Sequence, residues 1–254
     1  MTVASIERGR VLLVGAGPGA ADLITVRGYR ALQAADVVLY DNLIDESILD
    51  VVEGEAIYVG KRAGRHSIPQ EQICDLLAKH AMAGKFVVRL KGGDPTVLGR
   101  GGEEALHLAG LGIPVAFVPG VSNCIAAAEL AGVPVTHRGI ADSFCVVSAH
   151  RRGDEADFSM PPYHPRTTLV VMMGVGSLPQ WQPQLLGLGY PADVPVGFVT
   201  DAGRPEQRVL VTTLGEAVTF AVEQELRTPT TAIIGHVVQL REVLRGEDDR
   251  VQTA

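Results

Sequence analysis

Residues 85–104 of this chain read KFVVRLKGGDPTVLGRGGEE. The apolar run 86–90 predicts a buried strand, and Gly92-Gly93-Asp94-Pro95 predicts the turn that follows it. A second glycine loop, Gly99-Arg100-Gly101-Gly102, leads into Glu103-Glu104, where acids favour the first turn of a helix. The stretch therefore predicts a strand, a loop and a helix. Open α/β sheets bind ligands at the carboxyl ends of parallel strands, which is where this loop would lie.

The alternation of strand and helix continues on both sides of this stretch. Strand-like apolar runs occur at 11–14, 37–40, 57–59, 86–90 and 115–118. Helical patterns occur at 69–82, 102–111 and 121–131, and another helix begins near Thr25, a suitable N-cap. This β-α-β order predicts a parallel sheet that is covered by helices on both faces.

The pattern restarts after His137-Arg138-Gly139. Further strands are predicted at 144–147, 169–173, 196–199, 209–212 and 232–238. The Pro- and charge-rich residues 153–166 predict a surface excursion. Two α/β domains, 1–138 and 139–254, fit this order better than one continuous sheet.

A first glycine loop, Gly15-Ala16-Gly17-Pro18-Gly19-Ala20, follows the strand at 11–14. It matches the G-x-G-x-x-G/A pattern of dinucleotide-binding proteins, in which the last position opens a helix. Here Pro18 interrupts the pattern, and several residues intervene before the cap at Thr25. The loop is thus too long to seat a pyrophosphate on a helix N-terminus. It indicates a ligand loop but leaves the ligand open.

Composition restricts the classes of partner. The chain has 254 residues, 46% of them hydrophobic, and a net charge of −7, which argues against a broad basic surface for nucleic acid. No apolar run approaches the roughly 18 residues that span a bilayer. Three cysteines, in apolar surroundings, predict reduced thiols in a cytoplasmic protein.

Six segments carry a specific resemblance. They are VLLVGAGPG, ADVVLYDNL, VGKRAGRHS, RLKGGDPTVLGRGGEE, GIPVAFVPGVS and GVPVTHRG, in that order. Together they resemble the uroporphyrinogen-III C-methyltransferases of the tetrapyrrole methylase superfamily, densely over residues 10–138 and thinly beyond. The resemblance implies a tetrapyrrole-methylase-like fold, with the active-site cleft between two α/β domains. It also implies a cytoplasmic homodimer that needs no metal.

The same resemblance implies S-adenosylmethionine as the methyl donor and uroporphyrinogen III as the substrate. The product would be precorrin-2, formed by way of precorrin-1 and used in sirohaem and cobalamin biosynthesis. The implied donor-binding residues are Pro18, Gly92, Gly93, Asp94, Val97, Ser122, Asn123, Met173, Ala202, Thr230 and Thr231. Met172 and Asn123 depart from the residues usual in the family, and both changes touch the donor site.

The resemblance assigns two residues to the reaction. Asp41 follows the strand at 37–40 and would accept a proton, and Lys61 follows the strand at 57–59 and would donate one. A strand-end Asp or Lys is more often a loop cap or a solvated charge, and the matched context favours the catalytic interpretation more for Asp41 than for Lys61. A carboxylate there can stabilise a cationic intermediate.

The substrate carries eight carboxylates, so we expect a local basic pocket within this acidic chain. Candidate cations in or beside the motif loops are Lys61, Arg62, Arg65, Arg89, Lys91, Arg100, Arg138, Arg151 and Arg152. Of these, Arg100 and Arg138 are the predicted carboxylate forks. The pair Glu104 and His107 forms half of a carboxylate metal motif, but the sequence contains no second copy.

Three other functions remain open from the sequence. One is methylation of a later precorrin, and another is a Rossmann oxidoreductase, which Pro18 and the delayed helix disfavour. The third is a non-catalytic tetrapyrrole carrier, which would leave Asp41 and Gly92-Gly93-Asp94 unexplained.

Overall fold

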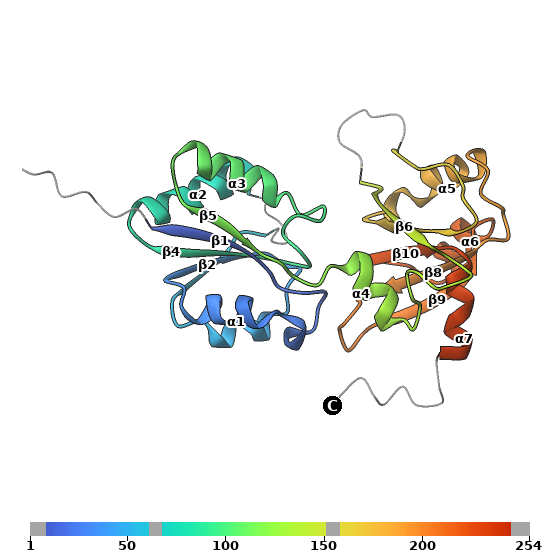
Figure 1. The fold of residues 1–254 in the computed structure, drawn as a ribbon, viewed down its shortest axis with the longest axis horizontal. Helices are drawn as coiled ribbons and strands as arrows, with labels where there is room; N and C mark the ends of the chain where they lie inside the picture. The colour runs from blue at the N-terminus through green and yellow to red at the C-terminus, as the bar shows by residue number, and fades with distance from the viewer. Residues whose placement is uncertain (1–8, 61–67, 151–157, 245–254) are drawn as a thin grey trace, which may run out of the picture. The chain divides into compact units, whose positions relative to one another are not determined.

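Five parallel strands form the first sheet of the computed structural model, which describes residues 9–60, 68–150 and 158–244. Their order across the sheet is β3-β2-β4-β1-β5 (Figure 1). The strands are β1 Arg10–Gly15, β2 Val37–Tyr40, β3 Glu55–Tyr58, β4 Phe86–Lys91 and β5 Val115–Val118. All five predicted strands are present, within two residues at each end. The motif strand β4 is central, which places the loop after it in the middle of the carboxyl edge.

Helices cover both faces of this sheet, as the sequence predicts (Figure 1). Helix α1 (Val26–Gln33) lies on one face, and α2 (Gln70–Met82) and α3 (Gly101–Gly110) lie on the other. Thr25 caps α1, because its hydroxyl accepts a hydrogen bond from the Gly28 amide at 3.2 Å. Short 3-10 turns at Ala21–Leu23 and Glu46–Val51 complete the connections.

Strand alternation divides the interior of the first unit into two cores. Val37, Leu39 and Val87 pack under α2 and α3, whereas Val38 and Val88 pack against α1. By the same alternation Arg89 belongs to the α2 and α3 face. The alternation of the strand therefore places the charged side chain of Arg89 in the otherwise apolar layer under α2 and α3.

The second sheet has the order β6-β7-β10-β8-β9 and is mixed. Only β6 and β7 run parallel, while the remaining neighbours are antiparallel. The strands are β6 Ser143–Ser148, β7 Thr167–Met172, β8 Pro195–Thr200, β9 Arg208–Thr213 and β10 Thr230–Ile234. The predicted strand at 232–238 is wrong in its second half, because Gly235, with φ of 148°, ends β10 and a 3-10 helix follows at His236–Leu240.

Helices also cover both faces of the second sheet. Helix α4 (Asn123–Leu130) packs with Val237 and Val238 on one face. Helices α5 (Leu178–Gly187) and α6 (Ala217–Glu223) pack on the other, around Trp181. A 3-10 turn at Val175–Ser177 precedes α5, and α7 (Arg241–Leu244) ends the described chain.

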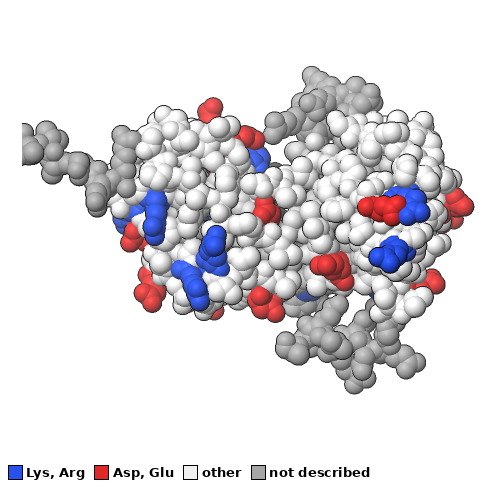
Figure 2. Space-filling model, viewed as in Figure 1, with Lys and Arg blue, Asp and Glu red and all other residues white. Residues whose placement is uncertain are grey.

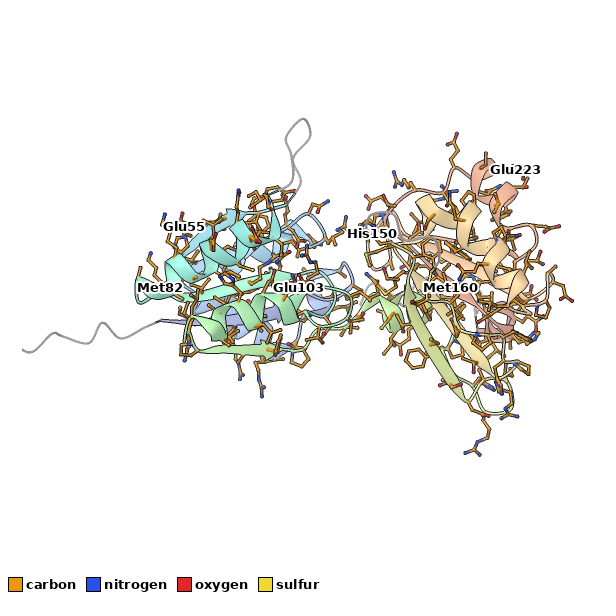
Figure 3. The ribbon with its side chains drawn as sticks, turned by 90° about the horizontal axis from the view of Figure 1, so that it is seen from above. Glu55, Met82, Glu103, His150, Met160 and Glu223 are labelled. Carbon is orange, nitrogen blue, oxygen red and sulfur yellow. The ribbon has the colours of Figure 1, made fainter. Side chains whose placement is uncertain are left out.

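Two expectations for the second half change in the structure. The predicted excursion at 153–166 is not wholly superficial: Phe158 and Met160 are buried in the core around Trp181 (Met160 is labelled in Figure 3). The chain also divides into compact units at Met1–Ser122 and Asn123–Ala254, ahead of the expected boundary after residue 138. The reason is that Ala127 and Ala128 of α4 are buried against the second sheet.

Candidate active site

Three glycine-containing loops are fastened together at the carboxyl edge of the first sheet. Gly17 and Gly93 exchange backbone hydrogen bonds, with N···O distances of 3.3 and 2.7 Å. Gly15 and Gly120 approach so closely that a Cβ on Gly15 would lie 2.5 Å from both the Gly120 Cα and the Gly93 oxygen. Glycine is required here because the loops after β1, β4 and β5 share one small volume.

Asp94 joins two of these loops through its side chain. One carboxylate oxygen accepts bonds from the Thr96 amide (2.8 Å) and hydroxyl (2.6 Å), and the other accepts a bond from the Gly120 amide (3.0 Å). Burial by itself would raise the pKa of Asp94, but the bonds from Thr96 and Gly120 outweigh it and lower the pKa. The carboxylate therefore organises the loop. Val97, in the same loop, is half-buried.

Asp41 directly follows β2, at the same edge of the sheet. Its Oδ1 accepts a hydrogen bond from the Leu43 amide at 3.1 Å, and its Oδ2 forms an ion pair with the Arg89 guanidinium at 2.8 Å. The side chain keeps 20% of its surface exposed. Asp41 is thus a loop cap, and it is also an oriented carboxylate open to solvent. Lys61, its predicted partner, lies outside the described residues, as do Arg62, Arg65, Arg151 and Arg152.

A buried charge cluster lies beneath Asp41. Glu104 Oε1 accepts hydrogen bonds from Arg89 Nε (3.3 Å), Lys91 Nζ (3.1 Å) and Gln70 Nε2 (2.9 Å). The side chains of Arg89, Lys91 and Glu104 are 4%, 7% and 0% exposed. Burial, aided by the positive charge of Arg89, lowers the pKa of Lys91, and Glu104 opposes that shift.

This cluster corrects part of the predicted basic pocket. Arg89 and Lys91 are among the candidate cations for the substrate, but both are buried and paired with Glu104. The sequence holds one signal that could have found them. Side chains alternate between the two faces of a strand, so in VVRLK the side chains of Arg89 and Lys91 point to the same face as the core residue Val87. The first turn of α3 covers that face.

The two predicted carboxylate forks are both exposed. Arg100 pairs with Glu103 at 2.7 Å, and this bond raises the pKa of Arg100 (Glu103 is labelled on α3 in Figure 3). Arg138 lies in the turn between His137 and Ala141. On the face drawn in Figure 2, basic and acidic side chains are interspersed.

Predicted donor residues also meet at one edge of the second sheet. Ala232 lies opposite Val171 across the antiparallel pair β10 and β7, so Thr230, which begins β10, and Met173, which follows β7, lie at the same end of the sheet. On its other side Thr230 pairs with Thr200, which immediately precedes Asp201 and Ala202. The Thr230 hydroxyl donates to the Arg227 carbonyl, so the Thr200 hydroxyl donates to Thr230, at 2.7 Å. Arg227 also pairs with Asp201 at 3.0 Å.

Thr231 does not share the surroundings of Thr230, although both are buried. Successive strand residues point to opposite faces, and Thr231 has the parity of Ile233, which packs under α4. Ser122 and Asn123 lie at the start of α4. The side chains of Thr230 and Thr231 therefore point to opposite faces of the second sheet.

Backbone strain gathers in these same segments. Leu98, Arg100, Met173 and Asp201 have φ between 50° and 61°, a left-handed conformation that side-chain-bearing residues rarely adopt. Leu98 and Arg100 belong to the loop before α3, and Met173 and Asp201 directly follow β7 and β8. Strain of this kind persists where surrounding structure enforces it and is frequent at ligand sites.

The sequence profile of the tetrapyrrole (corrin/porphyrin) methylases matches residues 10–218. The chain belongs to this family. It is 43% identical to the uroporphyrinogen-III C-methyltransferase of Methanocaldococcus jannaschii, over 91% of this chain and 98% of that protein. It is 44% identical to the siroheme synthase of Pseudomonas fluorescens, over 95% of this chain but 53% of that protein. The methylase thus spans about half the length of such siroheme synthases.

Solved structures of the family have the same two-domain fold. The uroporphyrin III C-methyl transferase of Thermus thermophilus aligns with a TM-score of 0.78 and 44% identity, over 91% of this chain and 94% of that one. A second structure of that enzyme, in complex with S-adenyl homocysteine, aligns equally well. A cobalt precorrin-4 methyltransferase aligns with a TM-score of 0.76 and 25% identity.

The half-motif of a metal site in this methylase has a different explanation. Glu104 is engaged by Arg89, Lys91 and Gln70, while His107 Nε2 lies 3.7 Å from Asp75 Oδ1. Among the described residues, no group of three or more His, Cys, Asp or Glu side chains could hold a metal ion.

Proposed function

We propose that this methylase transfers methyl groups from S-adenosylmethionine to carbon atoms of uroporphyrinogen III, giving precorrin-2 by way of precorrin-1. The observation that carries the proposal is Asp41, a partly exposed carboxylate beside the glycine loops that is oriented by Arg89. The near full-length similarity to the M. jannaschii enzyme supports the choice of substrate, and the Thermus complex supports the donor. The product would enter sirohaem or cobalamin biosynthesis.

S-adenosylmethionine supplies a methyl group that its sulfonium already activates. A pyrrole carbon attacks this methyl group: a carbon–carbon bond forms, the carbon–sulfur bond breaks, and its electron pair stays on sulfur. The tetrapyrrole is left as a cationic imine that is neutralised by loss of a meso proton. In our proposal Asp41 stabilises that cation and accepts the proton. Lys61 is our proposed proton donor.

The proposed donor site uses groups whose chemistry suits an amino acid joined to adenosine. On the first unit these are Pro18, Gly92, Gly93, Asp94, Val97 and Ser122. On the second they are Asn123, Met173, Ala202, Thr230 and Thr231. The strained backbones of Met173 and Asp201, and the hydrogen-bonded hydroxyls of Thr200 and Thr230 at the same end of the sheet, support this assignment. The backbone amide and carbonyl of Gly93 already bond to Gly17, so Gly93 would shape the loop around the donor and not bond to the donor itself.

Arg100 and Arg138 are our proposed contacts for the substrate carboxylates. Arg100 forms a two-bond pair with Glu103, at 3.1 and 2.7 Å, so a substrate carboxylate would displace Glu103 or share the guanidinium with it. Exposed ion pairs contribute little free energy, so this exchange costs little.

The test of the reaction is Asp41→Asn, which keeps size and polarity but cannot accept the proton. We expect turnover of uroporphyrinogen III to fall by about 10²–10⁴-fold, the usual contribution of general acid–base assistance. The affinity for S-adenosylhomocysteine, measured by calorimetry, should persist. Lys61→Ala should lower turnover less than Asp41→Asn does. Part of its effect should be a higher KM, because a lysine can act simply as a counter-charge for the substrate carboxylates.

The matched control is Asp45→Asn, since Asp45 caps the 3-10 helix at Glu46–Val51 through the Ser47 amide. It should retain wild-type turnover. Wild-type turnover in Asp41→Asn would refute the catalytic role of Asp41, and lost donor affinity would assign Asp41 to the donor. Turnover of a later precorrin with none of uroporphyrinogen III would favour the alternative substrate.

We also propose a cytoplasmic homodimer. Within residues 9–60, 68–150 and 158–244, no helix has the length and apolar character needed to cross a bilayer. In the apolar stretch 121–131, Ala127 and Ala128 are buried in the second unit, whereas Val121 and Ile125 remain exposed and could contribute to an interface.

A further inference from the structure

The contacts of Arg89 fix the direction of its guanidinium. Its Nη2 bonds to Asp41, its Nε bonds to Glu104, and its Nη1 donates to the Leu90 carbonyl at 2.8 Å. All three nitrogens are engaged within a planar group, so the group cannot turn without breaking several bonds. The orientation of Asp41 therefore depends on what holds the far side of Arg89.

Glu104 is the residue on that far side. It lies in the first turn of α3, its side chain is fully buried, and three donors converge on its Oε1. Its Oε2 is also buried and has no hydrogen-bond partner among the described residues. Burying a carboxylate costs desolvation free energy, and one of its oxygens here recovers none of it through a hydrogen bond. Proteins in which apolar residues replace a buried ion pair are often equally stable, so stability alone does not explain Glu104.

The charges of the cluster balance only while Glu104 is ionised. Asp41 and Glu104 carry two negative charges, and Arg89 and Lys91 carry two positive charges. Without the charge of Glu104, the cations Arg89 and Lys91 would compete for Asp41 as their one remaining anion in the cluster. Lys91 is two positions along β4 on the same face as Arg89, which makes that competition direct.

We infer that Glu104 is a positioning residue for the methyl transfer: through Arg89, and by occupying Lys91, it holds the Asp41 carboxylate in the orientation that the reaction needs. This inference rests on the proposed role of Asp41. It links the start of α3, and hence the GRGGEE segment, to the chemistry without requiring Glu104 to touch substrate or donor.

The test is a double-mutant cycle between Glu104→Gln and Asp41→Asn, with kcat and KM for uroporphyrinogen III and calorimetric affinity for S-adenosylhomocysteine as readouts. Glu104→Gln alone should lower kcat by about tenfold or more, within the range of coupling between residues of one network. KM and donor affinity should change little. In the Asp41→Asn background the same substitution should lower kcat no further, because the group that it positions is already gone.

Glu71→Gln is the matched control, since Glu71 occupies the first turn of α2 as Glu104 does that of α3, but is exposed. It should leave every readout unchanged. If Glu104→Gln folds poorly, the charge-balanced double variant Glu104→Gln/Lys91→Met replaces it. That variant removes one buried charge of each sign, and with it the competition from Lys91, but it still deprives Arg89 of its anionic partner. The part of the loss of kcat that passes through Arg89 should therefore persist, and it should be non-additive with Asp41→Asn.

Two results would overturn the inference. One is wild-type kcat in Glu104→Gln or its charge-balanced version. The other is an equal loss of kcat with and without Asp41, which would mean a general structural effect. Either can occur while Asp41→Asn remains slow, so the proposed function would stand. Wild-type turnover in Asp41→Asn would overturn both.

Discussion

At the scale of single residues, Asp94 shows how the protein uses a motif carboxylate. The sequence predicts that Asp94 contacts the donor, whereas the structure engages its oxygens with Thr96 and Gly120. Both uses are compatible at Oδ2, because Oδ1 already accepts two bonds from Thr96 whereas Oδ2 accepts one from Gly120 and has a second lone pair. Asp94 can thus influence the donor directly and through the shape of its loop.

Substitution of Asp94 should weaken donor binding. We expect Asp94→Ala to reduce the affinity for S-adenosylhomocysteine by about 1–3 kcal/mol, the usual cost of a lost charge-assisted hydrogen bond. Asp94→Asn, which keeps one acceptor oxygen, should reduce this affinity less than Asp94→Ala does. Unchanged affinity in a folded Asp94→Ala protein, measured by calorimetry, would place the donor elsewhere.

The same residue predicts a dependence of stability on pH. The pKa of Asp94 is lowered from 3.8 in the folded protein, so its contribution is complete above that value and is lost as pH falls through the lower folded pKa. The difference in unfolding free energy between wild type and Asp94→Asn should therefore be constant from about pH 5 to 7 and shrink near pH 3. Urea denaturation measures it, and a difference that grows on acidification would contradict it.

At the scale of elements, the loops after β1, β4 and β5 act as one body. A Cβ on Gly120 would overlap the Gly93 carbonyl oxygen and the Gly15 backbone, and neither is a flexible side-chain end. Gly120→Ala should therefore cost about 1–3 kcal/mol of unfolding free energy, as overpacking does, and should weaken binding of S-adenosylhomocysteine as the loops separate.

Gly110→Ala provides the comparison for this prediction. Gly110 ends α3, and a Cβ there would meet no atom within 4 Å. Alanine is the better helix former, so this variant should be neutral or more stable by up to about 1 kcal/mol. Thermal denaturation measures the stability of both variants, and calorimetry measures their affinity for S-adenosylhomocysteine. Equal values for the two variants would contradict the prediction, because they would show that the three loops can move apart at little cost in free energy.

At the scale of the whole molecule, the two units have separate sheets and separate cores. Some large apolar side chains lie outside these cores. They include Phe117, Val121 and Ile125, which are 42%, 37% and 38% exposed. Phe117 belongs to β5, an edge strand of the first sheet. Exposed apolar groups beside a sheet edge are typical of surfaces that another chain covers.

The homodimer can be tested directly by sedimentation equilibrium. At micromolar concentration we expect a mass near twice the 26.9 kDa of the chain. The apolar area that the dimer buries would offset the entropy lost on association. A monomer throughout the concentration range would exclude this assembly, without affecting the proposed reaction.

The sequence by itself determined the strand and helix order of the first unit and the loops that carry its motifs. It could do so because these are local properties: apolar periodicity marks β1, β2, β4 and β5, and Thr25 marks the start of α1. It also located Asp41 at a strand end, since that position follows directly from the pattern. Two of its errors lie where a glycine or a buried side chain changes the chain path, at Gly235 and at Phe158.

Tertiary structure alone decided which of these residues act together. Asp41 follows β2, whereas Arg89 lies in β4 and Glu104 in α3, and no local pattern states that their side chains meet. Likewise, the sheet order places Thr230, Met173 and Asp201 at the same end of the second sheet, while strand alternation turns the Thr231 side chain to the face opposite that of Thr230. Pairings of this kind depend on strand order and packing between distant segments, and the ionic cluster under Asp41 exists only because the fold buries opposite charges together.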